Sequence, residues 1–149
     1  MKYFEVKIRK LRFEWNKKPL TENDFFRLCK KLKISVTLMP LEVEGFYYAV
    51  KGRHYIAIDS NLRGLRRVFT MFHELGHFLM HAPETGVTAN FSGLVKDTVL
   101  EREADAFALC ALLPLHLVQT RTIQELVEDE SFPSGFVKDR MGVYQRYGF

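Results

Sequence analysis

The segment that decides the fold runs from residue 68 to residue 81 and reads VFTMFHELGHFLMH. Its apolar residues recur at the helical period, which predicts one helix from about residue 62 to residue 81. His73 and His77 are four positions apart, so both imidazoles project from one face and can bind one metal ion. Glu74 follows the first histidine and is placed to take a proton from a water molecule that the metal activates.

A third metal ligand is expected from the next helix of the chain. Zinc sites that hydrolyse peptides keep three protein ligands and leave one position open for water. The helical period predicts a second long helix over about residues 97–113, which stops at Pro114. At about 100° per residue, Glu103 is turned about 200° away from Glu101. Glu101 is the predicted ligand because its face of the helix carries small residues.

The face that carries Glu101 also permits a close contact between the two helices. Its other members are Ala104, Asp105, Ala108 and Leu112, and the alanines are small. Gly76 on the metal helix likewise has no side chain to hold the helices apart. Asp105 is predicted to accept a hydrogen bond from the outer nitrogen of a liganding histidine. The alternative is an ordinary charged helix start, in which acidic residues favour the helix dipole.

The other histidines and the tyrosines have weaker claims to the site. His81 repeats the four-residue spacing but lies about 12 Å along the axis from His73, so it is expected at the rim or as a helix C-terminal residue. His54 and His116 have no pattern around them, and a surface or core role is expected. Packing in the sheet is preferred to hydrogen bonding of an oxyanion for three tyrosines, Tyr47, Tyr48 and Tyr55. The alternative to a metal site is that His73 and His77 are two ordinary, partly buried histidines. Burying two histidines and Glu74 on an apolar helix without a shared purpose would cost free energy.

The remaining patterns predict an α+β fold. Residues 3–9 alternate as in a strand, and Thr21 with Asp24 forms a capping-box-like start for a helix over about 22–32. Three β-type runs follow, the last two arranged like a hairpin: residues 34–38, 45–50 and 54–59. Residues 82–96 carry turn residues and are expected to form a loop. The expected architecture is a small antiparallel sheet packed on the helical, metal-binding core.

One domain over residues 1–149 is the simplest organisation, because repeats, low-complexity runs and evident linkers are missing from the sequence. Residues 1–20 would form a basic N-terminal strand or extension. Residues 115–149 would form two or three short helices, broken near residues 132–135.

Composition bears on three properties: membrane association, the cellular compartment and nucleic-acid binding. No run approaches the roughly 18 apolar residues of a membrane helix, so no membrane association is expected. Cys29 and Cys110 lie in apolar helical contexts and are interpreted as buried thiols, which favours a cytoplasmic protein. The net charge of +4 is interpreted as a solvated basic surface, and direct nucleic-acid binding is not expected.

Residues 68–81 and 101–114 resemble the two signatures of the ImmA/IrrE family of metallopeptidases. The first segment looks like that family's metal helix almost throughout, and the second, EREADAFALCALLP, keeps its E-x-x-A-[ND] spacing. Residues 56–59 resemble the strand before the metal helix, and the similarity spans roughly residues 21–149. The resemblance implies a gluzincin-like fold in which Glu101 is the third metal ligand.

The resemblance also implies a cytoplasmic endopeptidase whose usual substrates are helix-turn-helix repressors. The expected function is hydrolysis of a peptide bond in such a protein, with zinc, or another divalent metal such as Mn²⁺, on His73, His77 and Glu101. A regulatory module that docks a repressor or antitoxin-like partner with little proteolysis is the alternative, and the intact Glu74 argues for the enzyme. The substrate is expected as an extended strand along the His54–Asp59 edge.

Overall fold

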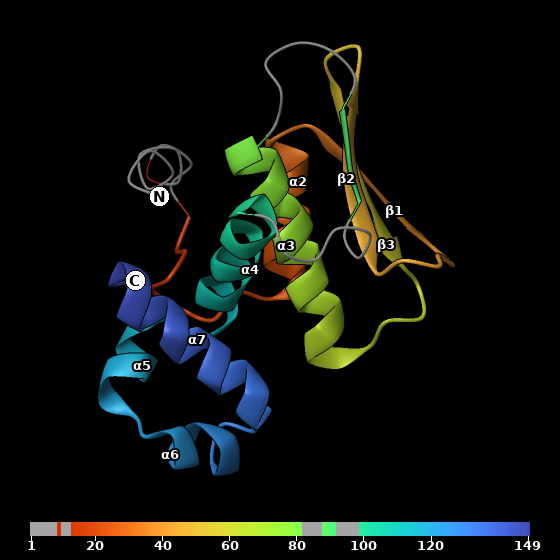
Figure 1. Cartoon of the computed structure of the whole chain (residues 1–149). Coiled ribbons are helices and arrows are strands. Elements are labelled where there is room, and N and C mark those ends of the chain that lie inside the picture. The colour runs from red at the N-terminus through yellow and green to blue at the C-terminus, as the bar shows by residue number, and fades with distance from the viewer. Residues whose placement is uncertain (1–8, 10–12, 82–87, 92–98) are drawn as a thin grey trace.

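The computed structural model describes residues 9, 13–81, 88–91 and 99–149 (Figure 1). Helix α2 (Glu22–Lys31) precedes three strands, β1 (Ile34–Met39), β2 (Gly45–Val50) and β3 (Arg53–Asp59). The long helix α3 (Gly64–His81) is followed by a short strand, β4 (Thr88–Phe91). The chain continues with α4 (Val99–Leu112), α5 (Leu115–Thr120), α6 (Ile123–Glu128) and α7 (Ser134–Tyr147). The predicted α+β class is confirmed.

Local sequence signals explain several element boundaries. The capping box at the start of α2 is present, because the Thr21 hydroxyl accepts a hydrogen bond from the backbone N–H of Asp24 and the Asp24 carboxylate accepts one from the N–H of Thr21. The β2–β3 hairpin is also confirmed, and its turn residues Lys51 and Gly52 both have positive φ. The break before α7 falls where Pro133 precedes the helix.

The sheet is mixed rather than antiparallel, which corrects the expectation from the sequence. Its strand order is β1-β3-β2-β4. β2 pairs antiparallel with both β3 and β4, but β1 pairs parallel with β3, in the register Ile34 to His54. The connection from β1 to β2 therefore passes the position of β3, and the hairpin folds back so that β3 lies in the centre.

The strand order shows that the prediction of substrate binding along residues 54–59 is wrong. Residues 54–59 belong to β3, whose backbone pairs with β1 on one side and β2 on the other. A strand that is paired on both sides has no free row of backbone donors and acceptors for a peptide. The outer strands of the described sheet are β1 and β4.

Two further expectations concern segments that are described only in part. The predicted loop over residues 82–96 contains a strand at 88–91, while residues 82–87 and 92–98 lie outside the described residues. The predicted N-terminal strand over 3–9 lies outside them too, except for Arg9, whose backbone is helical. None of the described helices has the length and apolar character needed to span a membrane.

The helices pack on one face of the sheet in successive layers. In Figure 1, α3 and α2 cover this face, and α4 lies on the side of α3 that is away from the sheet. The core between these layers is largely aromatic and aliphatic, and includes Phe25, Tyr47, Ile56, Phe72 and Phe107. α7 packs against the outer side of α4 and closes a second, smaller core with α5 and α6.

Gly76 lies where α3 and α4 come closest. A Cβ atom at this position would be 2.9 Å from Cδ1 of Phe107 and 3.4 Å from the Cα of Ala104. Phe107 has little freedom to move, because its ring is buried and stacks on Trp15 with centroids 5.7 Å apart. The indole N–H of Trp15 also donates a 3.0 Å hydrogen bond to the carbonyl of Phe107. The glycine is therefore required by close packing rather than by its backbone angles.

Arg140 ties α7 to the rest of the molecule from a fully buried position. Its guanidinium donates to the carbonyl of Leu113 at 2.6 Å, to that of Phe149 at 2.8 Å and to the side-chain oxygen of Asn16 at 3.0 Å. Burial lowers the pKa of this arginine, with a smaller opposing effect from Cys110. One side chain thus joins the end of α4, the segment before α2 and the end of α7.

Replacing Gly76 by alanine should destabilise the protein despite the better helix propensity of alanine. Overpacking of a tight core contact costs about 1–3 kcal/mol, which exceeds the gain of about 0.5–1 kcal/mol from removing a helical glycine. Gly142→Ala in α7 is the matched control, because a Cβ there meets no atom within 4 Å, and it should raise stability. Urea unfolding of both variants, with a chelator present to exclude metal effects, measures the difference. Equal stabilisation by both substitutions would contradict the tight contact.

Candidate metal centre

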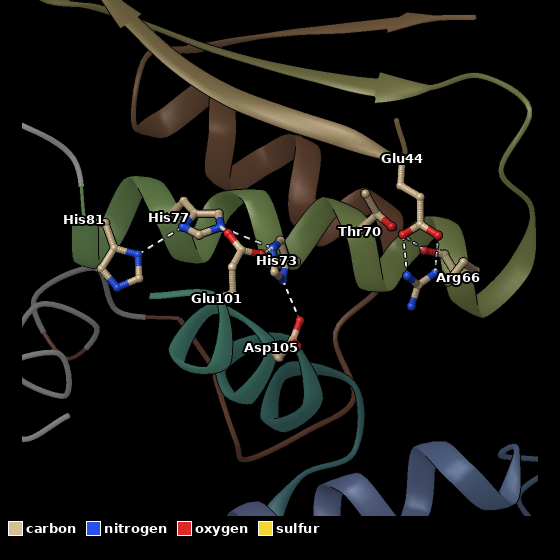
Figure 2. A network of polar contacts seen from close by, with 8 residues as sticks. All are labelled: Glu44, Arg66, Thr70, His73, His77, His81, Glu101 and Asp105. Carbon is tan, nitrogen blue, oxygen red and sulfur yellow. Dashed lines mark hydrogen bonds and ion pairs between the residues drawn. The ribbon is translucent and has the colours of Figure 1, made fainter. Parts of the chain in front are cut away.

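The two histidines of the H-E-x-x-H segment project from the middle of α3 toward α4 (Figure 2). Both are buried, His73 with 5% and His77 with 1% of its surface exposed. Their Nε2 atoms are 3.2 Å apart. Because residues four positions apart lie on one face of a helix, the Nε2 atoms of both rings meet at one point, as the spacing predicted.

Glu101, in the first turn of α4, completes this cluster. One carboxylate oxygen lies 3.1 Å from Nε2 of His73, and the other lies 2.9 Å from Nε2 of His77. The ligand atoms of these three residues all lie within 4.8 Å of one another. Four ligands held tetrahedrally at zinc bond lengths would be about 3.3 Å apart. The donor set and its spacing fit a divalent metal ion, which these three side chains could bind.

Glu74 is fully buried next to His73 on α3. Its negative charge is close enough to contribute to the raised pKa of His73. The centre therefore contains one carboxylate among the converging atoms and a second one beside them. Two carboxylates in a site that excludes bulk water favour a cation there.

Asp105 lies where the helical period predicts it, one turn after Glu101. One of its carboxylate oxygens is 2.8 Å from Nδ1 of His73, the ring nitrogen that faces away from the cluster. Its side chain is 51% exposed, so this carboxylate connects the buried imidazole to the surface. The contact is an ion pair at the outer nitrogen of His73, and the expected role of Asp105 as partner of a liganding histidine stays a prediction.

His81 and Glu103 form a contact that sequence reasoning missed. Nδ1 of His81 is 3.0 Å from Nδ1 of His77, and Nε2 of His81 is 3.1 Å from a carboxylate oxygen of Glu103. Glu103 therefore contacts the last residue of α3, although its place on the helix had suggested that it points away. The repeated four-residue spacing of His77 and His81 was the available signal.

The charges of the centre are strongly coupled. Burial alone would lower the pKa of His73, but the Asp105 and Glu101 carboxylates raise it to about 10. Burial would raise the pKa of Glu101, but hydrogen bonds from His73 and His77 lower it to about 2. Burial lowers the pKa of His81, against the influence of Glu103. Glu101 is thus held ionised between the histidines, and positive charge is favoured between these groups.

The remaining candidates of the sequence lie outside this cluster. Tyr47 is buried in β2 and shares a 2.8 Å hydrogen bond with Nδ1 of His54, and burial raises the pKa of Tyr47 to about 12. Tyr48 and Tyr55 stack on each other across the hairpin with centroids 4.8 Å apart. The expectation that these tyrosines pack within the sheet is confirmed. His116 is exposed on α5.

A cavity of about 680 Å³ adjoins the centre along α3, α4 and α7. Its lining includes Phe69, one turn before His73, and Asp105, which contacts His73. Lys138 and Arg146 of α7 line it as well. The candidate metal centre therefore lies beside a space bounded by apolar, acidic and basic side chains.

Comparison with known proteins shows the family to which the chain belongs. The model of a peptidase family, described as the IrrE N-terminal-like domain, matches residues 29–144, which include both helices of the centre. The "Uncharacterized immunity region protein 2" of Bacillus phage phi105 is 34% identical over 116 residues, which cover 76% of this chain and 73% of that protein. The resemblance found in the two sequence signatures is confirmed, and the chain belongs to the ImmA/IrrE family of metallopeptidase-like domains.

Proposed function

We propose that this chain is a zinc-dependent endopeptidase that hydrolyses a peptide bond in a protein substrate. The observation that carries the proposal is the convergence of His73, His77 and Glu101 beside the buried Glu74. Three protein ligands leave the fourth position of a tetrahedral ion open, as in zinc hydrolases. A purely structural zinc site would use four protein ligands and would have no need of a buried carboxylate beside them.

The roles of the residues follow from their chemistry. His73 and His77 would hold the metal through Nε2, and Glu101 through its carboxylate. A bound zinc ion, or another divalent metal such as Mn²⁺, supplies a Lewis acid that polarises a carbonyl and lowers the pKa of water. Glu74 accepts the proton that water loses as it attacks, and then carries it to the nitrogen of the leaving amine. Asp105 keeps the ring of His73 oriented.

A transcriptional repressor of the helix-turn-helix type is the proposed substrate. The family resemblance supports it, and so does the name of the phage relative, which assigns that protein to an immunity region. A cytoplasmic location fits the same proposal, since Cys29 and Cys110 are both buried free thiols. Docking of such a partner with little cleavage is the competing outcome that experiments must separate.

The purified full-length chain should bind about one zinc ion, as three converging ligands imply. Glu101→Ala removes one ligand, and the loss of affinity should exceed the roughly 10–100-fold typical for an outer partner of a metal ligand. Glu128→Ala on α6 is a matched control, since this carboxylate is exposed and far along the chain from the centre. Elemental analysis and competition with a chromophoric chelator measure both. Absence of metal in the wild type after reconstitution with zinc or manganese would overturn the proposed metal site.

Glu74→Gln should keep zinc binding and abolish proteolysis, because the amide preserves the shape but cannot accept the proton. A loss of about 10²–10⁴-fold or more is expected from removal of a general base. The zinc-loaded wild type and variant are incubated with a protein extract of the host, and new N-termini are identified by labelling and mass spectrometry. Equal cleavage by the variant would place the base elsewhere. No cleavage by either, with a protein retained on both, would favour docking over proteolysis.

A further inference from the structure

The outer nitrogen of His77 faces a second histidine rather than solvent. Nδ1 of His77 is 3.0 Å from Nδ1 of His81, and Nε2 of His81 is 3.1 Å from a carboxylate oxygen of Glu103. The side chain of His81 is only 6% exposed, and that of Glu103 is 28% exposed. Figure 2 shows His81 next to His77 at the end of α3, on the side opposite His73.

With a metal ion on Nε2 of His77, that nitrogen carries no proton, and the hydrogen bonds on the outer side of the ring have one possible direction. An ionised carboxylate has no proton to donate, so Nε2 of His81 is the donor to Glu103. In neutral His81 the other nitrogen, Nδ1, is then an acceptor. It accepts from Nδ1–H of His77, which is the tautomer whose Nε2 offers a lone pair to a metal. That nitrogen is the one that lies 2.9 Å from Glu101 and 3.2 Å from the corresponding nitrogen of His73.

His73 has a similar partner on its outer side, the carboxylate of Asp105. For His77 the carboxylate is that of Glu103, and His81 lies between the two. Asp105 lies 2.8 Å from Nδ1 of His73, where a carboxylate favours a proton on Nδ1 and leaves Nε2 available to a metal. No carboxylate is within direct reach of Nδ1 of His77 among the described contacts, and His81 spans the distance to Glu103. With a metal bound, both imidazoles would therefore be held in the same tautomer by partners on their outer side.

We propose that His81 and Glu103 are positioning residues for His77, which fix its proton on Nδ1 and its ring plane so that Nε2 is presented to a metal. The proposal rests on the metal site of the proposed function but not on the proteolysis. His81 is not a fourth ligand in this arrangement, because its near nitrogen faces the outer side of His77. Glu103 acts on the metal centre only through His81.

The competing explanation is that His81 merely fills space at the end of α3. Two substitutions separate the explanations. His81→Gln can keep both hydrogen bonds, since its amide oxygen accepts from His77 and its amide nitrogen donates to Glu103. His81→Leu keeps the bulk but neither hydrogen bond. A role in packing predicts that leucine replaces histidine without loss, whereas a positioning role predicts that only glutamine does.

Zinc affinity of the full-length chain, measured by chelator competition, is the decisive experiment. His81→Leu and Glu103→Ala should each weaken zinc binding by about 10–100-fold, the usual effect of losing such a partner. His81→Gln should restore most of it. The double variant His81→Leu/Glu103→Ala should lose no more than His81→Leu alone, because both residues belong to one chain of contacts. His116→Leu is the histidine control and should leave the affinity unchanged, since His116 is exposed on α5.

The outcomes separate this inference from the function on which it rests. Thermal unfolding without metal verifies that each variant is folded, and the absorption spectrum of the cobalt-loaded chains reports the geometry around the ion. Wild-type affinity in His81→Leu, or losses that add in the double variant, would overturn the positioning role while leaving the metal site intact. A wild-type chain that binds neither zinc nor cobalt would overturn both proposals.

Discussion

The close contact of α3 and α4 at Gly76 is the constraint on which the candidate metal centre depends. The two histidines belong to one helix and the carboxylate to the other, so their convergence is set by the distance between the helices. Phe107 and Ala104 occupy the space where a side chain at position 76 would lie. Trp15 holds Phe107 from behind through ring stacking and a hydrogen bond to its carbonyl. Residues outside the cluster thus help to set the distance between the two helices, and with it the distance of Glu101 from His73 and His77.

The centre also shows how a protein can keep several ionisable groups in its interior. Glu74 and Glu101 are carboxylates in a region from which bulk water is largely excluded, and isolated charges there would be costly. Without a metal ion, the protonated His73 balances the carboxylates, which is the meaning of its raised pKa and of the lowered pKa of Glu101. A divalent cation could supply the same balance from the middle of the cluster. A metal ion bound at Nε2 of His73 would displace a proton from that nitrogen.

Much of the centre could be predicted from the sequence because its geometry is local. Positions 73 and 77, or 101 and 105, are related by the helix alone, and a glycine opposite alanines indicates where two helices meet. The order of the strands could not be predicted, since the parallel pairing of β1 with β3 joins segments separated by a whole hairpin. Glu103 was misplaced for a different reason. The angle of about 100° per residue gives the direction of the Cα–Cβ bond of Glu103. It does not give the position of the carboxylate at the end of a long side chain, which here lies next to the last residue of α3.

The buried guanidinium of Arg140 has a consequence for how small this peptidase-like unit can be. Its three acceptors belong to the segment before α2, to the end of α4 and to the end of α7. A fragment that stopped at Pro114, just after α4, would retain every residue of the candidate metal centre. It would nevertheless leave the Leu113 carbonyl without its buried donor and uncover the core that Val137 fills. The candidate metal ligands therefore do not define a minimal fragment, and the C-terminal helices belong to the smallest stable unit.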